Sequence, residues 1–310
     1  MTKSFKLAAA AAGLAGAAVG GLSWYIMETT AFGYRQTLDE AFQWQEEHYD
    51  VSWFDRSATE DYVIKSYDGY LLHASFVRGS ADSRKFVIIT HGYTDNRYGM
   101  LKYLKMYLDE GYSAVIYDIR GHGENDRTNC TYSLREAKDL CAVIEDTYRR
   151  YGEDIYLGLH GESLGAATTV RSLMYKPRVR FAVADCGFAD ITNVLEGSVR
   201  SRHVPLFCLK AASRLAKRVY GHSFEEMRPI DALKDNSVPL LFIHGGKDSF
   251  VPPENSRRMH EAAKNCSELL IIPEAAHAAS VLTDPEQYYE RLKAFLDRVE
   301  GKLIFNNDLK

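Results

Sequence analysis

The chain has 310 residues, of which 46% are hydrophobic and 26% are charged, as is typical of a globular protein. Its formal net charge of −4 argues against binding to nucleic acid, because such proteins carry an excess of Lys and Arg for the phosphates. The five cysteines are scattered and form no Cys-x-x-Cys pair, so we expect neither a zinc site nor a disulfide framework.

The N-terminal segment is uncharged and apolar between two early lysines and Glu28. The run from Leu7 to Met27 is long enough for one membrane crossing, so residues 1–28 are predicted to be a membrane anchor. The lysines favour a cytoplasmic N-terminus, which places the rest of the chain outside the cytoplasm. The small-x-small pattern at 15–17 leaves a cleaved signal peptide, and hence secretion, as the alternative.

Residues 29–60 mix aromatic and acidic side chains and are expected to form a helical stalk. The pattern changes at residue 61, where the main domain is expected to begin and to extend to residue 305. Two strands are predicted at 62–66 and 70–77, and the Asp-Gly pair in the turn between them is a hairpin signal.

Short apolar runs then alternate with helical patterns. Strands are expected at 86–90, 113–118, 155–159, 181–185, 240–243 and 269–272, and helices at 100–110, 134–151, 164–174 and 285–299. A hairpin followed by repeated strand–helix units predicts an α/β fold, with a mostly parallel sheet and helices on both faces. Residues 188–235 lack a convincing strand and are expected to be a helical insertion that acts as a lid.

The pentapeptide Gly161-Glu162-Ser163-Leu164-Gly165 directly follows the strand expected at 155–159. A serine flanked by glycine at minus two and plus two, between a strand and a helix, is the sequence form of a nucleophile elbow. The turn is too tight for a Cβ at the glycine positions, and it holds the serine oxygen near the free N–H groups of a helix N-terminus. Ser163 is the candidate nucleophile, although the pentapeptide alone also fits a glycine-rich turn.

A second loop is expected to complete an oxyanion site. His91-Gly92-Tyr93 follows the strand at 86–90, and Gly92 allows close approach of the loop to the serine. Acyl transfer requires preorganised N–H groups that hold the oxygen of the tetrahedral intermediate. The backbone N–H groups of Tyr93 and Leu164 are the candidates.

Asp248 and His277 are the candidate partners of the serine. Asp248 lies in a glycine turn after the strand at 240–243, and His277 lies in a loop after the strand at 269–272. Histidine suits general acid and base catalysis near neutral pH, and a carboxylate fixes its tautomer. The chain order serine, acid, histidine is that of elbow hydrolases.

These motifs together resemble the α/β-hydrolase superfamily over about residues 61–299. Within it the chain is similar to bacterial membrane-anchored serine hydrolases related to esterases, acyl hydrolases and prolyl-oligopeptidase-like domains. The resemblance implies that the turn over 118–123 is structural, so that His122 is not catalytic. No propeller domain precedes the hydrolase-like segment, which argues against an oligopeptidase role. The matching segments are 90–93, 117–123, 160–165, 243–248 with 251–252, and His277.

The sequence thus predicts a serine hydrolase that cleaves small-molecule carboxylic esters through an acyl-enzyme intermediate, with no cofactor and no metal. A peptidase or a thioesterase that uses the same three residues is the first alternative. A non-catalytic binding module on a hydrolase fold is the second alternative. Such modules usually lack the nucleophile or the base, whereas this sequence contains both.

Overall fold

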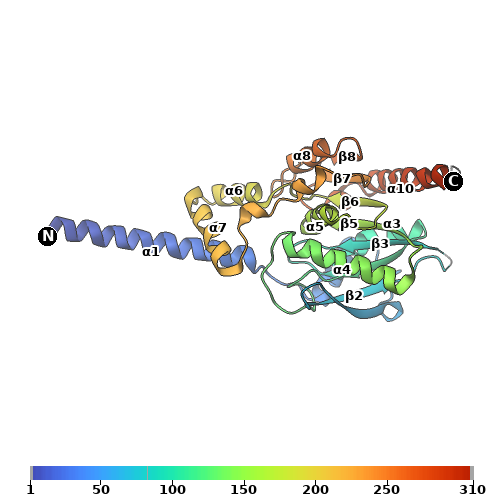
Figure 1. The fold of residues 1–310 in the computed structure, drawn as a ribbon, viewed down its shortest axis with the longest axis horizontal. Coiled ribbons are helices and arrows are strands. Elements are labelled where there is room, and N and C mark those ends of the chain that lie inside the picture. The colour runs from blue at the N-terminus through green and yellow to red at the C-terminus, as the bar shows by residue number, and fades with distance from the viewer. Residues whose placement is uncertain (1–2, 82, 308–310) are drawn as a thin grey trace.

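An eight-stranded sheet forms the centre of the computed structural model, which describes residues 3–81 and 83–307 (Figure 1). The strand order is β1-β2-β4-β3-β5-β6-β7-β8. Strand β2 pairs antiparallel with β1 and β4, and the other neighbours are parallel. The strands are β1 Glu60–Lys65, β2 Leu71–Val77, β3 Lys85–Thr90, β4 Ser113–Tyr117, β5 Tyr156–Glu162, β6 Phe181–Asp185, β7 Leu240–Gly245 and β8 Ser267–Ile272.

Helices cover both faces of this sheet. The α-helices are α1 Lys3–Ala31, α2 Leu38–His48, α3 Leu101–Asp109, α4 Leu134–Tyr151, α5 Leu164–Ser172, α6 Ile191–Ser201, α7 Leu206–Tyr220, α8 Glu254–Ala262, α9 Ser280–Thr283 and α10 Pro285–Asn307. Short 3-10 helices are η1 Arg56–Ala58, η2 Arg97–Met100, η3 Leu173–Tyr175, η4 Phe224–Glu226 and η5 Pro229–Leu233.

The inner strands are buried on both sides because they consist of continuous apolar runs. Every residue of β4, β6 and β7 is buried. Ile88 of β3 belongs to a core with side chains of α4, α5 and α8, whereas the adjacent Val87 belongs to a second core with α3 and α10. The predicted α/β-hydrolase fold, with a mostly parallel sheet and helices on both faces, is confirmed.

The carboxyl ends of the parallel strands meet at one edge of the sheet. The loops after β3, β5, β7 and β8 therefore lie together, and these loops carry the candidate catalytic and oxyanion-binding residues. Between β6 and β7 the chain forms α6, α7, η4 and η5, which occupy the segment expected as a lid over 188–235.

The segment before the sheet packs onto the domain. Helix α1 extends away from the sheet, and its C-terminal part packs against α7 (Figure 1). Helix α2, which lies within the stalk expected at 29–60, packs against η2, and its Ala41 and Gln45 are buried.

The anchor predicted over residues 1–28 lies mostly in α1, and its first two residues are outside the described part of the chain. No helix within residues 3–81 and 83–307 combines the length and apolar character that a membrane crossing requires. The cellular location stays a prediction from the sequence.

Candidate active site

Ser163 lies at a sharp turn between β5 and α5. Its backbone has φ +53° and ψ −110°, a positive-φ conformation outside the commonly allowed regions that costs energy for a residue with a side chain. A Cβ on Gly161 would lie 2.2 Å from the carbonyl oxygen of Gly165. A Cβ on Gly165 would lie 2.0 Å from the carbonyl oxygen of Thr90. Both glycines are required by close backbone packing, so the turn has the geometry of a nucleophile elbow.

Three side chains from separate loops form one chain of hydrogen bonds. Ser163 Oγ lies 2.9 Å from His277 Nε2, and His277 Nδ1 lies 2.6 Å from Asp248 Oδ2. The Asp248 side chain is fully buried, whereas that of His277 is 23% exposed. The three candidate catalytic residues therefore lie within bonding reach of one another, although 114 residues separate the serine from the histidine.

Asp248 is held as a carboxylate by its hydrogen bonds. Burial by itself would raise its pKa, but hydrogen bonds from His244 and His277 outweigh burial and lower the pKa to about 2. The backbone N–H groups of Phe250 and Val251 also donate to Oδ1, at 3.0 and 2.8 Å. The charge needed to orient His277 and to stabilise its imidazolium form is thus present at neutral pH.

His244 is a partner of Asp248 to which the sequence analysis gave no role. Its Nε2 lies 2.7 Å from the carbonyl oxygen of Val251 and 3.2 Å from Asp248 Oδ2. Because a carbonyl only accepts, Nε2 carries the proton, and Nδ1 then accepts the hydroxyl proton of Ser256 at 2.7 Å. The position of His244 at the end of β7, four residues before the acid, is the signal that could have identified it.

The two candidate oxyanion donors lie beside the nucleophile. A Cβ on Gly92 would lie 3.6 Å from Ser163 Cβ, so the loop after β3 runs against the elbow. Leu164 begins α5, where backbone N–H groups have no intrahelical acceptor. Within the described chain, neither the Tyr93 N–H nor the Leu164 N–H donates a hydrogen bond. Both remain free to hold an oxyanion.

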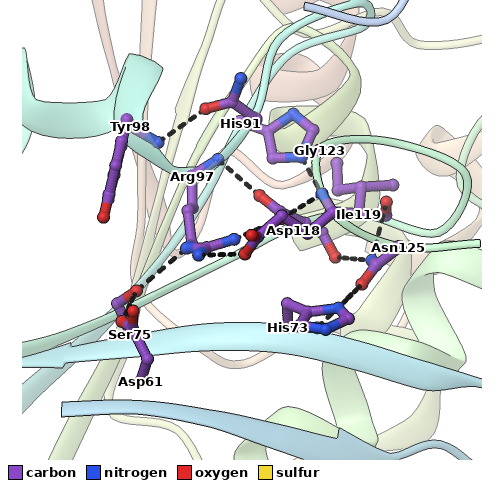
Figure 2. A network of polar contacts seen from close by, with 12 residues as sticks. Asp61, His73, Ser75, His91, Arg97, Tyr98, Asp118, Ile119, Gly123 and Asn125 are labelled. Carbon is purple, nitrogen blue, oxygen red and sulfur yellow. Dashed lines mark hydrogen bonds and ion pairs between the residues drawn. The ribbon is translucent and has the colours of Figure 1, made fainter. Parts of the chain in front are cut away.

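A network of polar contacts fixes the loop that carries Tyr93 (Figure 2). Asp118, at the end of β4, accepts hydrogen bonds from the Arg97 backbone N–H at 2.9 Å and from Arg97 Nη1 at 2.5 Å. The backbone N–H of Ile119 donates to His91 Nε2 at 2.8 Å. The turn after β4 therefore ties both ends of the loop over 91–97.

His122 lies in this structural region and not among the catalytic residues. Its ring packs edge-on against His91, and Nδ1 lies 2.9 Å from the carbonyl oxygen of Arg120. Burial lowers the pKa of both histidines, which keeps them neutral. This placement agrees with the structural role that the resemblance implies.

A buried group of charges lies next to Ser163, and no motif in the sequence points to it. Lys102 Nζ pairs with Glu162 Oε2 at 2.5 Å, with both side chains at most 5% exposed. The Tyr103 hydroxyl lies 2.6 Å from Glu162 Oε2 and 3.0 Å from Asp185 Oδ2. Burial, followed by the charge of Glu162, raises the pKa of Asp185 to about 6 and that of Asp95 to about 7.

Two hollows meet at Ser163 and differ in character. The polar hollow, of about 300 Å³, is lined by Asp95, Lys102, Glu162, His277 and parts of α2. The apolar hollow, of about 410 Å³, is lined mainly by aromatic and aliphatic side chains from the end of α1, from α6 and from the loops near Ser163. Tyr93 and Ser163 line both hollows.

No group of three or more His, Cys, Asp or Glu side chains within the described residues has an arrangement that would hold a metal ion. The chemistry that the arrangement supports is that of the serine, histidine and aspartate side chains with two backbone N–H groups.

Curated relatives resemble most of the chain. An uncharacterised protein of Bacillus subtilis is 29% identical over 253 residues, which cover 79% of this chain and 82% of the relative. The alpha/beta hydrolase domain-containing protein 17C of Xenopus tropicalis is 27% identical over 271 residues, which cover 84% of this chain and 75% of the relative.

Solved structures share the fold. An esterase of Pyrococcus furiosus matches with a TM-score of 0.66 and 25% identity, and the match covers 77% of this chain and 91% of the esterase. An acylaminoacyl peptidase of Pyrococcus horikoshii matches with a TM-score of 0.61 and 18% identity, over 78% of this chain and 41% of the peptidase. The second likeness shows the fold alone.

Residues 100–302 match the model of the prolyl oligopeptidase family. This range contains the three candidate catalytic residues, Ser163, Asp248 and His277. With the fold and the relatives above, it shows that the chain is a hydrolase of the α/β-hydrolase superfamily and belongs to the prolyl oligopeptidase family.

Proposed function

We propose that this hydrolase cleaves carboxylic esters through a covalent acyl-enzyme on Ser163. The observation that carries the proposal is the continuous chain of hydrogen bonds from Asp248 through His277 to Ser163, at 2.6 and 2.9 Å. A serine hydroxyl is a weak nucleophile unless an adjacent base removes its proton. The match to an esterase structure at 25% identity also supports the proposal.

In the first half of the reaction His277 Nε2 takes the proton of Ser163 Oγ, and the oxygen attacks the ester carbonyl. The Tyr93 and Leu164 N–H groups hold the oxyanion, and Asp248 stabilises the imidazolium of His277. His277 then protonates the leaving alcohol. In the second half, His277 activates a water that releases the acid from Ser163.

The two hollows suggest how the substrate lies. The leaving alcohol receives its proton from His277, so it must occupy the hollow that His277 lines, which is the polar one. The acyl group then extends into the apolar hollow on the other side of Ser163. This orientation places the apolar part of the ester against apolar walls.

Steady-state hydrolysis of p-nitrophenyl esters tests the proposal. We expect wild-type protein to release p-nitrophenol, and Ser163→Ala to lower kcat by at least about 10⁴-fold while the protein stays folded. Circular dichroism of the variant provides the folding control. Equal turnover by wild type and Ser163→Ala would contradict the assignment of the nucleophile.

Amide hydrolysis is the second candidate, because the family model that matches this chain is that of a peptidase family. Values of kcat/KM for an ester, a thioester and an aminoacyl anilide with the same acyl group separate the candidates. The ester proposal expects the ester to have the highest value relative to its uncatalysed rate. A higher relative value for the anilide would favour a peptidase.

A further inference from the structure

The C-terminal end of α1 forms part of the apolar hollow. Tyr25, Thr29 and Thr30 line it together with residues of α6 such as Val194 and Leu195. Among the described residues that line this hollow, Arg202 is the one that carries a charge. The end of the segment predicted to be an anchor and the start of the predicted stalk therefore line a hollow that reaches Ser163.

This end of α1 is firmly packed against the domain. Met27 is fully buried, and Ile26 is 9% exposed. The Tyr220 hydroxyl of α7 donates to Glu28 Oε1 at 2.5 Å, and the backbone N–H of Cys130 donates to the carbonyl oxygen of Ala31 at 2.8 Å. The helix end is thus a fixed wall, because side chains and backbone from two separate segments hold it.

The same helix end holds the loop that carries the oxyanion donor. The carbonyl oxygen of Thr30 accepts hydrogen bonds from the hydroxyls of Tyr93, at 3.0 Å, and of Tyr132, at 2.8 Å. The last carbonyls of a helix have no intrahelical donor, so these hydroxyls satisfy one of them. A Cβ on Gly33 would lie 2.5 Å from the Tyr93 hydroxyl oxygen, so the chain passes directly over that side chain.

We propose that the apolar hollow is an acyl-chain site and that the C-terminal end of α1 sets the length of acyl chain it accepts. This inference rests on the proposed ester hydrolysis. An unbranched, uncharged acyl group fits walls that are mostly aliphatic and aromatic. The hollow, of about 410 Å³, is large enough for an acyl chain much longer than an acetyl group, so a ten-carbon acyl chain is a suitable long substrate for the test.

The test compares p-nitrophenyl decanoate with p-nitrophenyl acetate, because the two esters share one leaving group. The measured quantity is the ratio of their kcat/KM values, which does not depend on the fraction of protein that is folded. Thr29→Trp adds bulk from α1 into the hollow and should lower the ratio about tenfold or more, since each methylene excluded costs about fourfold in binding. Leu195→Trp narrows the hollow from α6 and should lower the ratio in the same way.

Gly20→Trp is the matched control, because a Cβ at Gly20 on the same helix meets no atom within 4 Å. It should leave the ratio unchanged. A ratio that falls in Leu195→Trp but not in Thr29→Trp would overturn the role of α1 while ester hydrolysis stands. A ratio unchanged in both variants would overturn the acyl-chain site. Failure of the wild type to hydrolyse either ester would instead overturn the proposed function.

Discussion

On the side of Ser163 that faces α2 and α3, the walls carry Asp95, Lys102 and Glu162, whereas on the side that faces α6 they carry Val194 and Leu195. The stability of the charged side depends on pairing between its charged groups, because a buried charge is costly unless it is paired and hydrogen-bonded. The apolar side depends on packing, which tolerates changes of shape more readily. Ser163 therefore lies between a wall that is sensitive to single substitutions and a wall whose shape can be altered.

Asp248→Asn tests the reacting groups that lie between the two sides. An amide cannot stabilise the imidazolium and disfavours the tautomer that His277 needs, so we expect kcat for p-nitrophenyl acetate to fall about 10⁴-fold. Val194→Ala on the apolar wall serves as the comparison and should change KM more than kcat. A loss in Asp248→Asn smaller than tenfold would contradict the role of Asp248.

Lys102→Met removes the partner of Glu162 and leaves a carboxylate with little exposure to solvent. We expect a loss of about 3 to 5 kcal/mol in the free energy of unfolding, measured by urea denaturation. The double variant Lys102→Met with Glu162→Gln should recover much of this loss. Ile191→Val on the apolar side should cost only about 1 kcal/mol. Equal losses in Lys102→Met and Ile191→Val would remove the contrast between the two sides.

The pH dependence of the free energy of unfolding, compared between wild type and Asp95→Asn, tests the charged side. In the folded chain the pKa of Asp95 is about 7, above its value of about 3.9 in unfolded chains, so folding favours the protonated form. Stability from this group is present below pH 4 and is lost as pH rises through 7. Between pH 4 and pH 8 the free energy of unfolding of Asp95→Asn should therefore rise relative to that of wild type by about 4 kcal/mol. A difference that does not vary with pH would contradict the burial of this carboxyl.

Tyr93→Phe changes a residue that lines both hollows and tests the role of its hydrogen bond to Thr30. The variant keeps the backbone N–H but loses the hydrogen bond to Thr30, so we expect kcat to fall about three- to tenfold with little change in KM. Tyr132→Phe is the control, because Tyr132 donates to the same carbonyl and carries no oxyanion donor. It should lose similar stability and keep kcat. Equal kcat values in the two variants would argue against positioning by α1.

Local sequence patterns were sufficient to predict several strands and helices and the three candidate catalytic residues. The apolar run at 181–185 coincides with β6, and the helix expected at 134–151 coincides with α4. These segments have long, strong periodicity or uninterrupted apolar residues, so their structure is decided locally. The three candidate catalytic residues were found because each follows a strand whose carboxyl end lies at the same sheet edge.

The sequence could not predict contacts that depend on how distant segments pack. Lys102 lies in a helix where a lysine normally indicates a solvent-exposed face, and only the fold brings Glu162 to it. The apolar run that ends near Met27 indicates a membrane helix as readily as one packed on a protein surface. The last turn of this helix contacts Tyr93 through a backbone carbonyl, and such a contact cannot be predicted from the residue type.

Labelling with a fluorophosphonate asks whether Ser163 is the nucleophile of this hydrolase. Such probes react with a serine only when a neighbouring base activates it. Mass spectrometry of the digested protein should place one adduct per chain on Ser163 and none on Ser163→Ala. An unlabelled wild-type protein, or an adduct on another residue that persists in Ser163→Ala, would rule out Ser163 as the nucleophile.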